Sequence, residues 1–378
     1  MSSTTKSSGS VGFLGPGVAL MTRLGARYKF WSLPFPIIVA LCIVVGLRIN
    51  TLWSEDRYAG KRLEANAFIV HVSDAIFPLQ ALTGQVQLAS SGNKQGLAAS
   101  GPTLQKLKAA LDQLDVAIKD HASAEGNQRW NNLRSGLTGL SKLTDSNAKL
   151  SEADVRHLNS VLFHLYELMV FEADSSGLML SPEADIYYLS VLQIERLYPW
   201  LENIGLIRAR GDAYLSGSDS SASDLLNLRS MADRLDDQAA RVKSKQDALL
   251  HFGSQAITNW NAAIAEGKKL AAATNSLGSA PPSQTDFLAL STRAIEATDQ
   301  ARTEVGKQIG QLLMERKQYL VSQIVITLAV SMLALLIWWY LLLSFFRSTQ
   351  MDRAHTDQII EIASTGDLTQ TAASGIRT

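Results

Sequence analysis

The amino-acid sequence predicts an all-α fold, in which two transmembrane helices flank a helical bundle that lies outside the membrane. Two apolar runs contain no charged residue, Trp31–Leu47 and Leu320–Phe346. Between them, apolar residues recur every three or four positions, which is the spacing of amphipathic helices. Proline is scarce, at 9 of 378 residues, and the sequence has no convincing run of alternating β-branched residues. These observations favour helices throughout.

The second apolar run is the stronger membrane candidate. As a helix, Leu320–Phe346 would be about 40 Å long, more than the roughly 30 Å of a bilayer core. Trp338 and Trp339 lie toward its C-terminal end, where amphipathic rings favour a membrane interface. A core helix is rarely so long and apolar on every face. We therefore predict a transmembrane helix over residues 319–346.

The first apolar run follows a basic arm. Residues 1–30 contain four basic residues and no acidic residue. A cleaved signal peptide is the alternative interpretation, because signal peptides also begin with a basic segment. No clear small-x-small cleavage site follows the run, which favours an uncleaved transmembrane helix over residues 31–49. Basic segments remain in the cytoplasm, so residues 1–30 and 347–378 are predicted inside and residues 50–318 outside.

Composition excludes several classes of partner and chemistry. Lys plus Arg equals Asp plus Glu, at 35 each, and no basic stripe indicates a nucleic-acid partner. The single cysteine, Cys42, excludes a disulfide framework and a Cys-based metal site. His157 and His164 share a helical face, but no acidic or Cys partner marks them as ligands. With no Walker, GxGxxG, HExxH or GxSxG motif, we predict no enzyme activity, no cofactor and no metal.

The outer region is predicted to contain about eight helices. A faint internal repeat divides it into two four-helix units, residues 50–180 and 181–318. Trp130 and Trp260 are each followed by asparagine and, ten residues on, by leucine; Ser151 and Ser283 each precede an aspartate by three positions, as at a helix start. Two of the clearest apolar stripes are Leu104, Leu107, Leu111, Leu114 and Ile118, and Val155, Leu158, Leu162, Leu165 and Met169.

A ligand site is hypothesised where polar side chains interrupt an apolar helix. Between residues 176 and 215 the chain carries Arg196, Arg208 and Arg210 together with Tyr187 and Tyr188. Arginine pairs carboxylates bidentately, so a small organic anion near Arg208 and Arg210 is one hypothesis. The preferred interpretation is plainer, with the arginines in water and the tyrosines packed in the core. The identity of any ligand stays open.

The last outer helix is predicted to run from about Gln284 directly into the second apolar run, because no Gly-Pro break separates them. A shift of this helix would then be transmitted mechanically. Gly306 and Gly310 form a GxxxG pattern, which is weak evidence of close packing in a water-exposed helix. Beyond the apolar run, a short helix is expected to end near Ser364, with Gly366 as its terminator.

A family resemblance follows from these features. The sequence IASTGDLTQ, residues 362–370, resembles the connector that follows the first helix of a HAMP domain, with Gly366, Asp367 and Leu368 as its signal-relay residues. The segment LSPEADIYYL, residues 180–189, is similar to sequences in helical sensor regions of chemoreceptors and sensor kinases. The order of span, helical outer domain, span and HAMP resembles bacterial chemoreceptors, the methyl-accepting chemotaxis proteins.

The resemblance implies a signal-transducing receptor in the bacterial inner membrane, with a periplasmic sensing domain. It implies a parallel homodimer in contact with membrane lipid, and, if an output domain follows, a chemotaxis kinase and its coupling protein as partners. Two alternatives stay open. The chain is the input half of a sensor histidine kinase or nucleotide cyclase, or it is a structural membrane oligomer without output. The sequence encoded beyond Thr378 would separate them.

Overall fold

The structure, a computed structural model, describes residues 34–90, 94–121, 123–137, 140, 150–217, 221–252 and 257–364. Within these ranges the chain is all-α, as predicted, and contains no strand. It forms eight helices when α7, the π-helix η3 and α8 are counted as the one continuous segment that they make.

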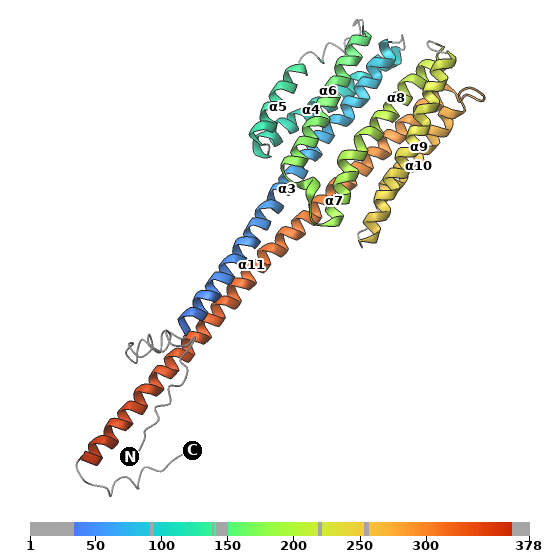
Figure 1. Cartoon of the computed structure of the whole chain (residues 1–378). Coiled ribbons are helices and arrows are strands. Elements are labelled where there is room, and N and C mark those ends of the chain that lie inside the picture. The colour runs from blue at the N-terminus through green and yellow to red at the C-terminus, as the bar shows by residue number, and fades with distance from the viewer. Residues whose placement is uncertain are drawn as a thin grey trace, which may run out of the picture. The chain divides into compact units, whose positions relative to one another are not determined.

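The helices follow one another along the chain (Figure 1). In chain order they are α3 (Pro34–Ser90), α4 (Lys94–His121), α5 (Ala124–Gly136), α6 (Glu152–Ser175), the 3₁₀ turn η2 (Leu178–Leu180), α7 (Ala184–Ser190), η3 (Val191–Arg196), α8 (Leu197–Leu215), α9 (Ala222–His251), α10 (Thr258–Asn275) and α11 (Gln284–Ser364).

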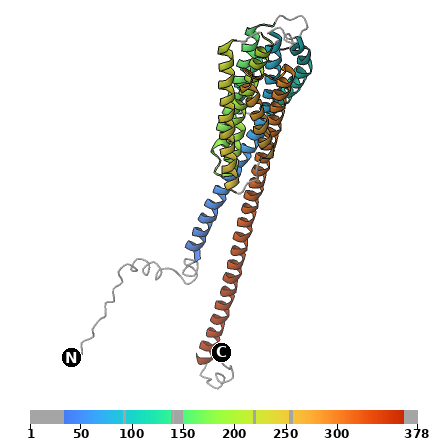
Figure 2. The ribbon, with the colours of Figure 1, turned by 90° about the vertical axis from the view of Figure 1, so that its right-hand side faces the viewer.

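The chain divides into two compact units. One contains the apolar segments, residues 1–55 and 320–378 as far as they are described, and the other is the bundle Asp56–Tyr319. The bundle includes helices from both predicted four-helix units, and the division between those units stays a prediction. Figure 2 shows that the helices of the bundle run along one common direction.

The predicted apolar stripes form the core of the bundle. Every residue named above from the two stripes is buried except Leu111, which is partly buried against the same core. The predicted helix starts are also present. The hydroxyl of Ser151 accepts a hydrogen bond from the Asp154 amide at 3.4 Å, and that of Ser283 accepts one from the Asp286 amide at 3.1 Å. Both serines thus satisfy an amide that the helix itself leaves unpaired.

Three helices, α3, α8 and α11, approach closely in the middle of the bundle. The Trp200 indole on α8 is fully buried and donates to the Thr298 hydroxyl on α11 at 3.0 Å. Gly205 on α8 leaves room for Gln80 of α3, because a Cβ at Gly205 would overlap the amide of Gln80. α8 therefore packs against both α11 and α3.

Pro199 perturbs the helix that carries it, and the perturbation takes the form of a π-helix. The sequence predicts a kink at this proline. Proline lacks an N–H and its ring clashes with the carbonyl four residues earlier, here that of Glu195. The wider turn Val191–Arg196 ends three residues before Pro199. Single π-turns of this kind occur frequently at functional sites.

The first unit holds two helical segments that are long and apolar enough to cross a membrane. The most apolar 18-residue windows of α3 and α11 are only 6% buried. α11 is unbroken from Gln284 to Ser364, which confirms the predicted continuity through Leu320–Phe346 and the predicted helix end near Ser364. Gly366, Asp367 and Leu368 lie outside the described residues.

Gly267 of α10 tests the packing in the bundle. A Cβ on Gly267 would stand 2.5 Å from the Trp200 ring, whereas a Cβ on Gly84 of α3 would meet nothing within 4 Å. We expect Gly267→Ala to destabilise the chain by about 1–3 kcal/mol, the usual effect of overpacking. Gly84→Ala is the matched control and should stabilise it by up to about 1 kcal/mol. Thermal unfolding followed by circular dichroism measures both, and equal shifts would contradict this packing.

Candidate functional site

The structure separates the residues of the predicted ligand site. Arg196 ends the π-helix, whereas Arg208 and Arg210 lie farther along α8. At 1.5 Å per residue, Arg196 and Arg208 are about 18 Å apart along the helix axis. Tyr187 and Tyr188 lie on α7, before the π-helix. One small molecule cannot touch all five side chains.

Arg208 has an internal counter-charge. Burial lowers the pKa of Arg208, and Asp212, one turn further along α8, acts in the opposite direction. The Asp212 side chain is 2% exposed and accepts a hydrogen bond from the Gln284 amide at 2.7 Å. Arg210 is exposed. Asp212 thus connects α8 to the start of α11, whereas the Nε of Arg208 is buried without a hydrogen-bond partner among the described residues.

The two tyrosines are in aromatic contacts. Tyr188 stacks on Phe252 with 5.8 Å between ring centroids, and the Lys245 ammonium lies 5.6 Å from the centre of the Tyr188 ring. Tyr187 meets Tyr188 edge to face at 5.2 Å. These contacts favour a packing role for Tyr188, while Tyr187 is partly open to solvent at 37% exposure.

Arg196 lines a cleft between the π-helix and α9. The cleft has a volume of about 240 Å³. Arg196 lies 3.5 Å from Glu195, and its Nε is buried without a hydrogen-bond partner in the described part of the chain. The residues lining the cleft are Glu195, Arg196, Pro199, Arg234, Asp237, Gln238, Arg241 and Val242. Three arginines against two acids leave the cleft with one net positive charge.

The cleft is connected by hydrogen bonds to the helix around Pro199. The Gln238 amide of α9 donates to the Pro199 carbonyl at 3.0 Å and accepts from the Asn203 amide at 3.3 Å. Arg241 is paired with Asp237 at 2.9 Å. A ligand that displaced these polar groups would therefore act directly on the π-helix and on the start of α8.

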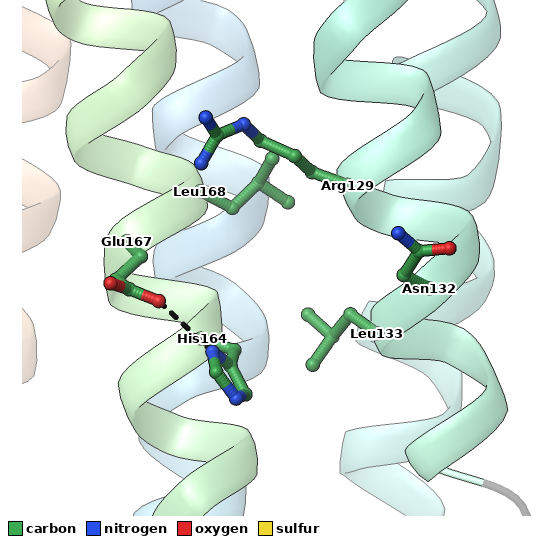
Figure 3. Close-up of a pocket in the computed structure, with 6 residues that line it drawn as sticks. All are labelled: Arg129, Asn132, Leu133, His164, Glu167 and Leu168. Atoms are coloured by element: carbon green, nitrogen blue, oxygen red, sulfur yellow. Dashed lines mark hydrogen bonds and ion pairs between the residues drawn. The ribbon is translucent and has the colours of Figure 1, made fainter.

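A second groove lies between α5 and α6 (Figure 3). Its volume is about 260 Å³. Arg129 reaches from α5 toward α6, where its guanidinium lies 4.2 Å from the centre of the Phe171 ring, and it is paired with Glu125 at 2.8 Å. His164 is paired with Glu167 at 2.9 Å. None of its lining residues has a buried polar atom without a partner among the described residues, so this groove is the weaker candidate.

A buried polar seam runs between α3, the π-helix and α11. Asn66 is 4% exposed and donates to the Gly306 carbonyl at 3.0 Å; Gln193 is 1% exposed. A Cβ on Gly306 would stand 2.9 Å from Val70 and 3.4 Å from the Gln193 amide nitrogen, and one on Gly310 would stand 3.4 Å from the Asn66 amide. The GxxxG pair is thus a close-packing surface against α3.

The seam continues into an ion-pair group. Arg302 of α11 has a side chain that is 8% exposed and lies 2.7 Å from Asp74 of α3 and 2.8 Å from Asp299. Its guanidinium also lies 5.1 Å from the centre of the Phe77 ring. Because a buried arginine needs charged partners, this group fixes the register of α11 against α3.

The connector between α6 and α7 joins both long helices. The Glu183 carboxylate lies 3.6 Å from Arg62 of α3 and 3.0 Å from Arg316 of α11. Arg62 also donates to the Gly177 carbonyl at 3.1 Å, and the Ser181 hydroxyl donates to Glu183 at 2.8 Å. Glu183 lies within the segment 180–189 that the sequence singles out, and it precedes α7.

Sequence reasoning missed the residues that make contacts across the bundle. Asn66 and Gln193 carry a usable signal, because each is an uncharged polar residue at a position that an apolar stripe would fill. Arg62, Arg302 and Arg316 carry none, because arginines are frequent on the solvated faces of helices.

Within the described ranges, no group of three or more His, Cys, Asp or Glu side chains is placed to hold a metal ion. Comparisons with protein-family models, curated proteins and solved structures find no match to the chain. The case for a function therefore depends on the geometry of the bundle.

Glu183 provides a test of the connector. Glu183→Gln removes the charge that faces Arg62 and Arg316, and we expect it to destabilise the full chain by about 1–2 kcal/mol. The control is Glu152→Gln on α6, where Glu152 is 85% exposed and paired with Arg156. That change should stay within about 0.5 kcal/mol. Denaturant unfolding measures the free energy of unfolding of both variants. Equal losses would mean that the Glu183 ion pairs stabilise the chain no more than an exposed ion pair does.

Proposed function

We propose that this protein is a transmembrane signal-transducing receptor. Its bundle senses an extracytoplasmic stimulus, and α11 relays the response across the membrane to a cytoplasmic output. The observation that carries the proposal is the continuity of α11, which forms one helix from Gln284 to Ser364. The same helix contributes core residues to the bundle and contains the apolar run Leu320–Phe346.

The part of α11 that lies in the bundle makes both apolar and polar contacts with its neighbours. Many of its apolar side chains are buried, and polar contacts hold it at intervals through Thr298, Arg302 and Gly306. The buried apolar residues of this part are Phe287, Ala294, Ala297, Ala301, Val305, Ile309 and Leu313. A rearrangement of the bundle would therefore move α11 along or about its axis, as small helix shifts do in other switching proteins.

Three features support a membrane position for the apolar segments. Their 18-residue windows are 6% buried, unlike a core helix of a soluble protein. The N-terminal arm is basic, which favours a cytoplasmic N-terminus. Arg316, a basic residue on the side where the charge rule disfavours one, pairs with Glu183 in the connector and so has a structural reason to be there.

A chemotaxis output is the favoured continuation. It depends on the resemblance to chemoreceptors and on the HAMP-like residues Gly366, Asp367 and Leu368. A parallel homodimer, a chemotaxis kinase and a coupling protein belong to this proposal. The input half of a sensor histidine kinase or nucleotide cyclase is the alternative, and α11 would serve it equally well. The third candidate, a structural membrane oligomer without output, does not require one helix to be both packed in the bundle and continuous with an apolar run.

The favoured ligand position is the cleft at Arg196. A small organic anion fits its volume of about 240 Å³ and its net positive charge. The buried, unpartnered Nε of Arg196 offers a donor, and guanidinium groups bind carboxylates strongly. The hypothesis is centred here rather than on Arg208 and Arg210 because Arg196 lines a cleft. Arg208 lies in the field of Asp212, and its Nε is likewise buried without a hydrogen-bond partner among the described residues.

The relay through α11 is tested by breaking the helix. Inserting Gly-Gly-Ser after Gln318 should uncouple the bundle from the output, because glycine and serine there end the rigid helix. The matched control inserts seven alanines, which adds two helical turns and keeps the helix continuous. In a hybrid of residues 1–378 with a kinase output, the first insertion should abolish the response and the second should retain it. A response that survives Gly-Gly-Ser would contradict the relay.

The ligand position is tested with two variants on the same helical segment. Succinate and its uncharged analogue 1,4-butanediol are added to the full chain in detergent, and thermal unfolding is followed. We expect succinate alone to raise the midpoint, and Arg196→Gln to weaken its binding at least tenfold, about 1.4 kcal/mol. Arg208→Gln should keep the succinate response. Loss of the response with Arg208→Gln but not with Arg196→Gln would move the site along α8.

A further inference from the structure

The seam between α3, the π-helix and α11 contains amide groups that are complementary but not paired with each other. Both amide atoms of Gln193 are buried without a hydrogen-bond partner in the described chain. The amide nitrogen of Asn66 donates to the Gly306 carbonyl at 3.0 Å, and its Oδ1 has no partner among the described residues. A buried polar atom without a partner is costly, so two such side chains at one place require an explanation.

Both side chains meet at the same glycine. The Gln193 amide nitrogen lies 3.4 Å from the position that a Cβ on Gly306 would take, and Asn66 bonds to the carbonyl of Gly306. Gln193 Nε2 is a donor without an acceptor, and Asn66 Oδ1 is an acceptor without a donor. A small relative movement of the two helices would join them. Because residue 306 is glycine, it has no side chain of its own to obstruct that movement.

The element that carries Gln193 is suited to such a movement. Gln193 lies inside the π-helix Val191–Arg196, whose wider turn accommodates one residue more than an α-helical turn. If the extra residue of this turn moved to a neighbouring turn, the Gln193 side chain would point in a different direction. The flanking helices would stay intact. Arg196, three residues further on, lines the anion cleft, so an occupied cleft would act on the same turn.

We propose that Gln193 and Asn66 form a two-state hydrogen-bond latch on α11. In the state described above, Asn66 holds the Gly306 carbonyl and Gln193 is unpaired. In the second state, the π-helix has shifted and the Asn66 side chain has turned toward Gln193, so that Gln193 Nε2 donates to Asn66 Oδ1 and Asn66 Nδ2 no longer reaches the Gly306 carbonyl. The role of this latch in signalling deepens the proposed receptor function and rests on it, because the latch would be the switch through which the bundle releases α11.

Two buried glutamines allow a matched stability test. Gln193→Met removes only groups that are unpaired in the described state, so the thermal midpoint of the full chain in lipid nanodiscs should rise. Gln246 of α9 is 5% exposed, and its amide donates to the Ile257 carbonyl at 3.3 Å. Gln246→Met should therefore lower the midpoint. If a fixed buried water satisfied Gln193, Gln193→Met would lower the midpoint as well, and the latch would be wrong.

A distance measurement tests the second state without relying on any output. Spin labels are attached at Tyr187→Cys on α7 and Lys307→Cys on α11, both exposed positions, in a chain in which Cys42 is replaced by alanine. The distance distribution should show two populations in this background and one after Gln193→Met. A single population in both would overturn the latch. Two populations that are unaffected by Gln193→Met would overturn it too, because the movement would then not depend on this side chain.

The signalling readout separates the latch from the receptor proposal. In the hybrid with a kinase output, Gln193→Met should hold the basal kinase activity at least fivefold above or below that of the parent hybrid. The kinase activity should then no longer respond to a stimulus. If the parent hybrid has no response while the distance populations behave as expected, the receptor proposal fails and the latch stands as a conformational property of the bundle. If the parent responds and Gln193→Met leaves that response intact, the latch fails and the receptor proposal stands.

Discussion

The close approach of α11 to its neighbours at Gly306 and Gly310 is the constraint on which the rest of the bundle depends. Without side chains at these two positions, Val70 and Asn66 of α3 and Gln193 of the π-helix can lie directly against the backbone of α11. Larger residues would force the three elements apart and separate the Trp200 indole from Thr298. The register set here also places Arg302 beside Asp74.

This arrangement joins regions that are far apart in the sequence. The cleft at Arg196 lies on the π-helix, the π-helix touches α11 through Gln193, and the connector at Glu183 pairs with arginines of both α3 and α11. The contacts of Gln193 and Glu183 thus end on helices that contain the apolar segments. In the proposed receptor, a stimulus need only change the balance between two packings of one seam, which is how small differences in binding become helix movements.

The sequence was sufficient for the elements but not for their mutual contacts. Periodicity predicted the helices because burial of an apolar stripe dominates their formation, and Ser151 and Ser283 marked helix starts because capping is local.

The π-helix was missed: Pro199 predicts a disturbance, but whether the helix kinks or widens depends on tertiary packing. The pairing of Glu183 with Arg62 and Arg316 was also invisible, because it joins residues more than a hundred positions apart. The predicted ligand site stays a prediction. Arg196 and Arg208 are about 18 Å apart along the helix axis, so one small ligand would reach only part of the predicted set of residues.

The central claim is that α11 carries a signal from one side of a membrane to the other, and its topology can be measured directly. With Cys42 replaced by alanine, single cysteines are introduced at Lys307→Cys in the bundle and Ile360→Cys near the end of α11, where Ile360 is 60% exposed. Intact cells with a permeabilised outer membrane are treated with a membrane-impermeant maleimide. The receptor account predicts labelling of the cysteine at position 307 at once, and of that at position 360 only after the inner membrane is opened. Labelling of both positions before the inner membrane is opened would contradict it.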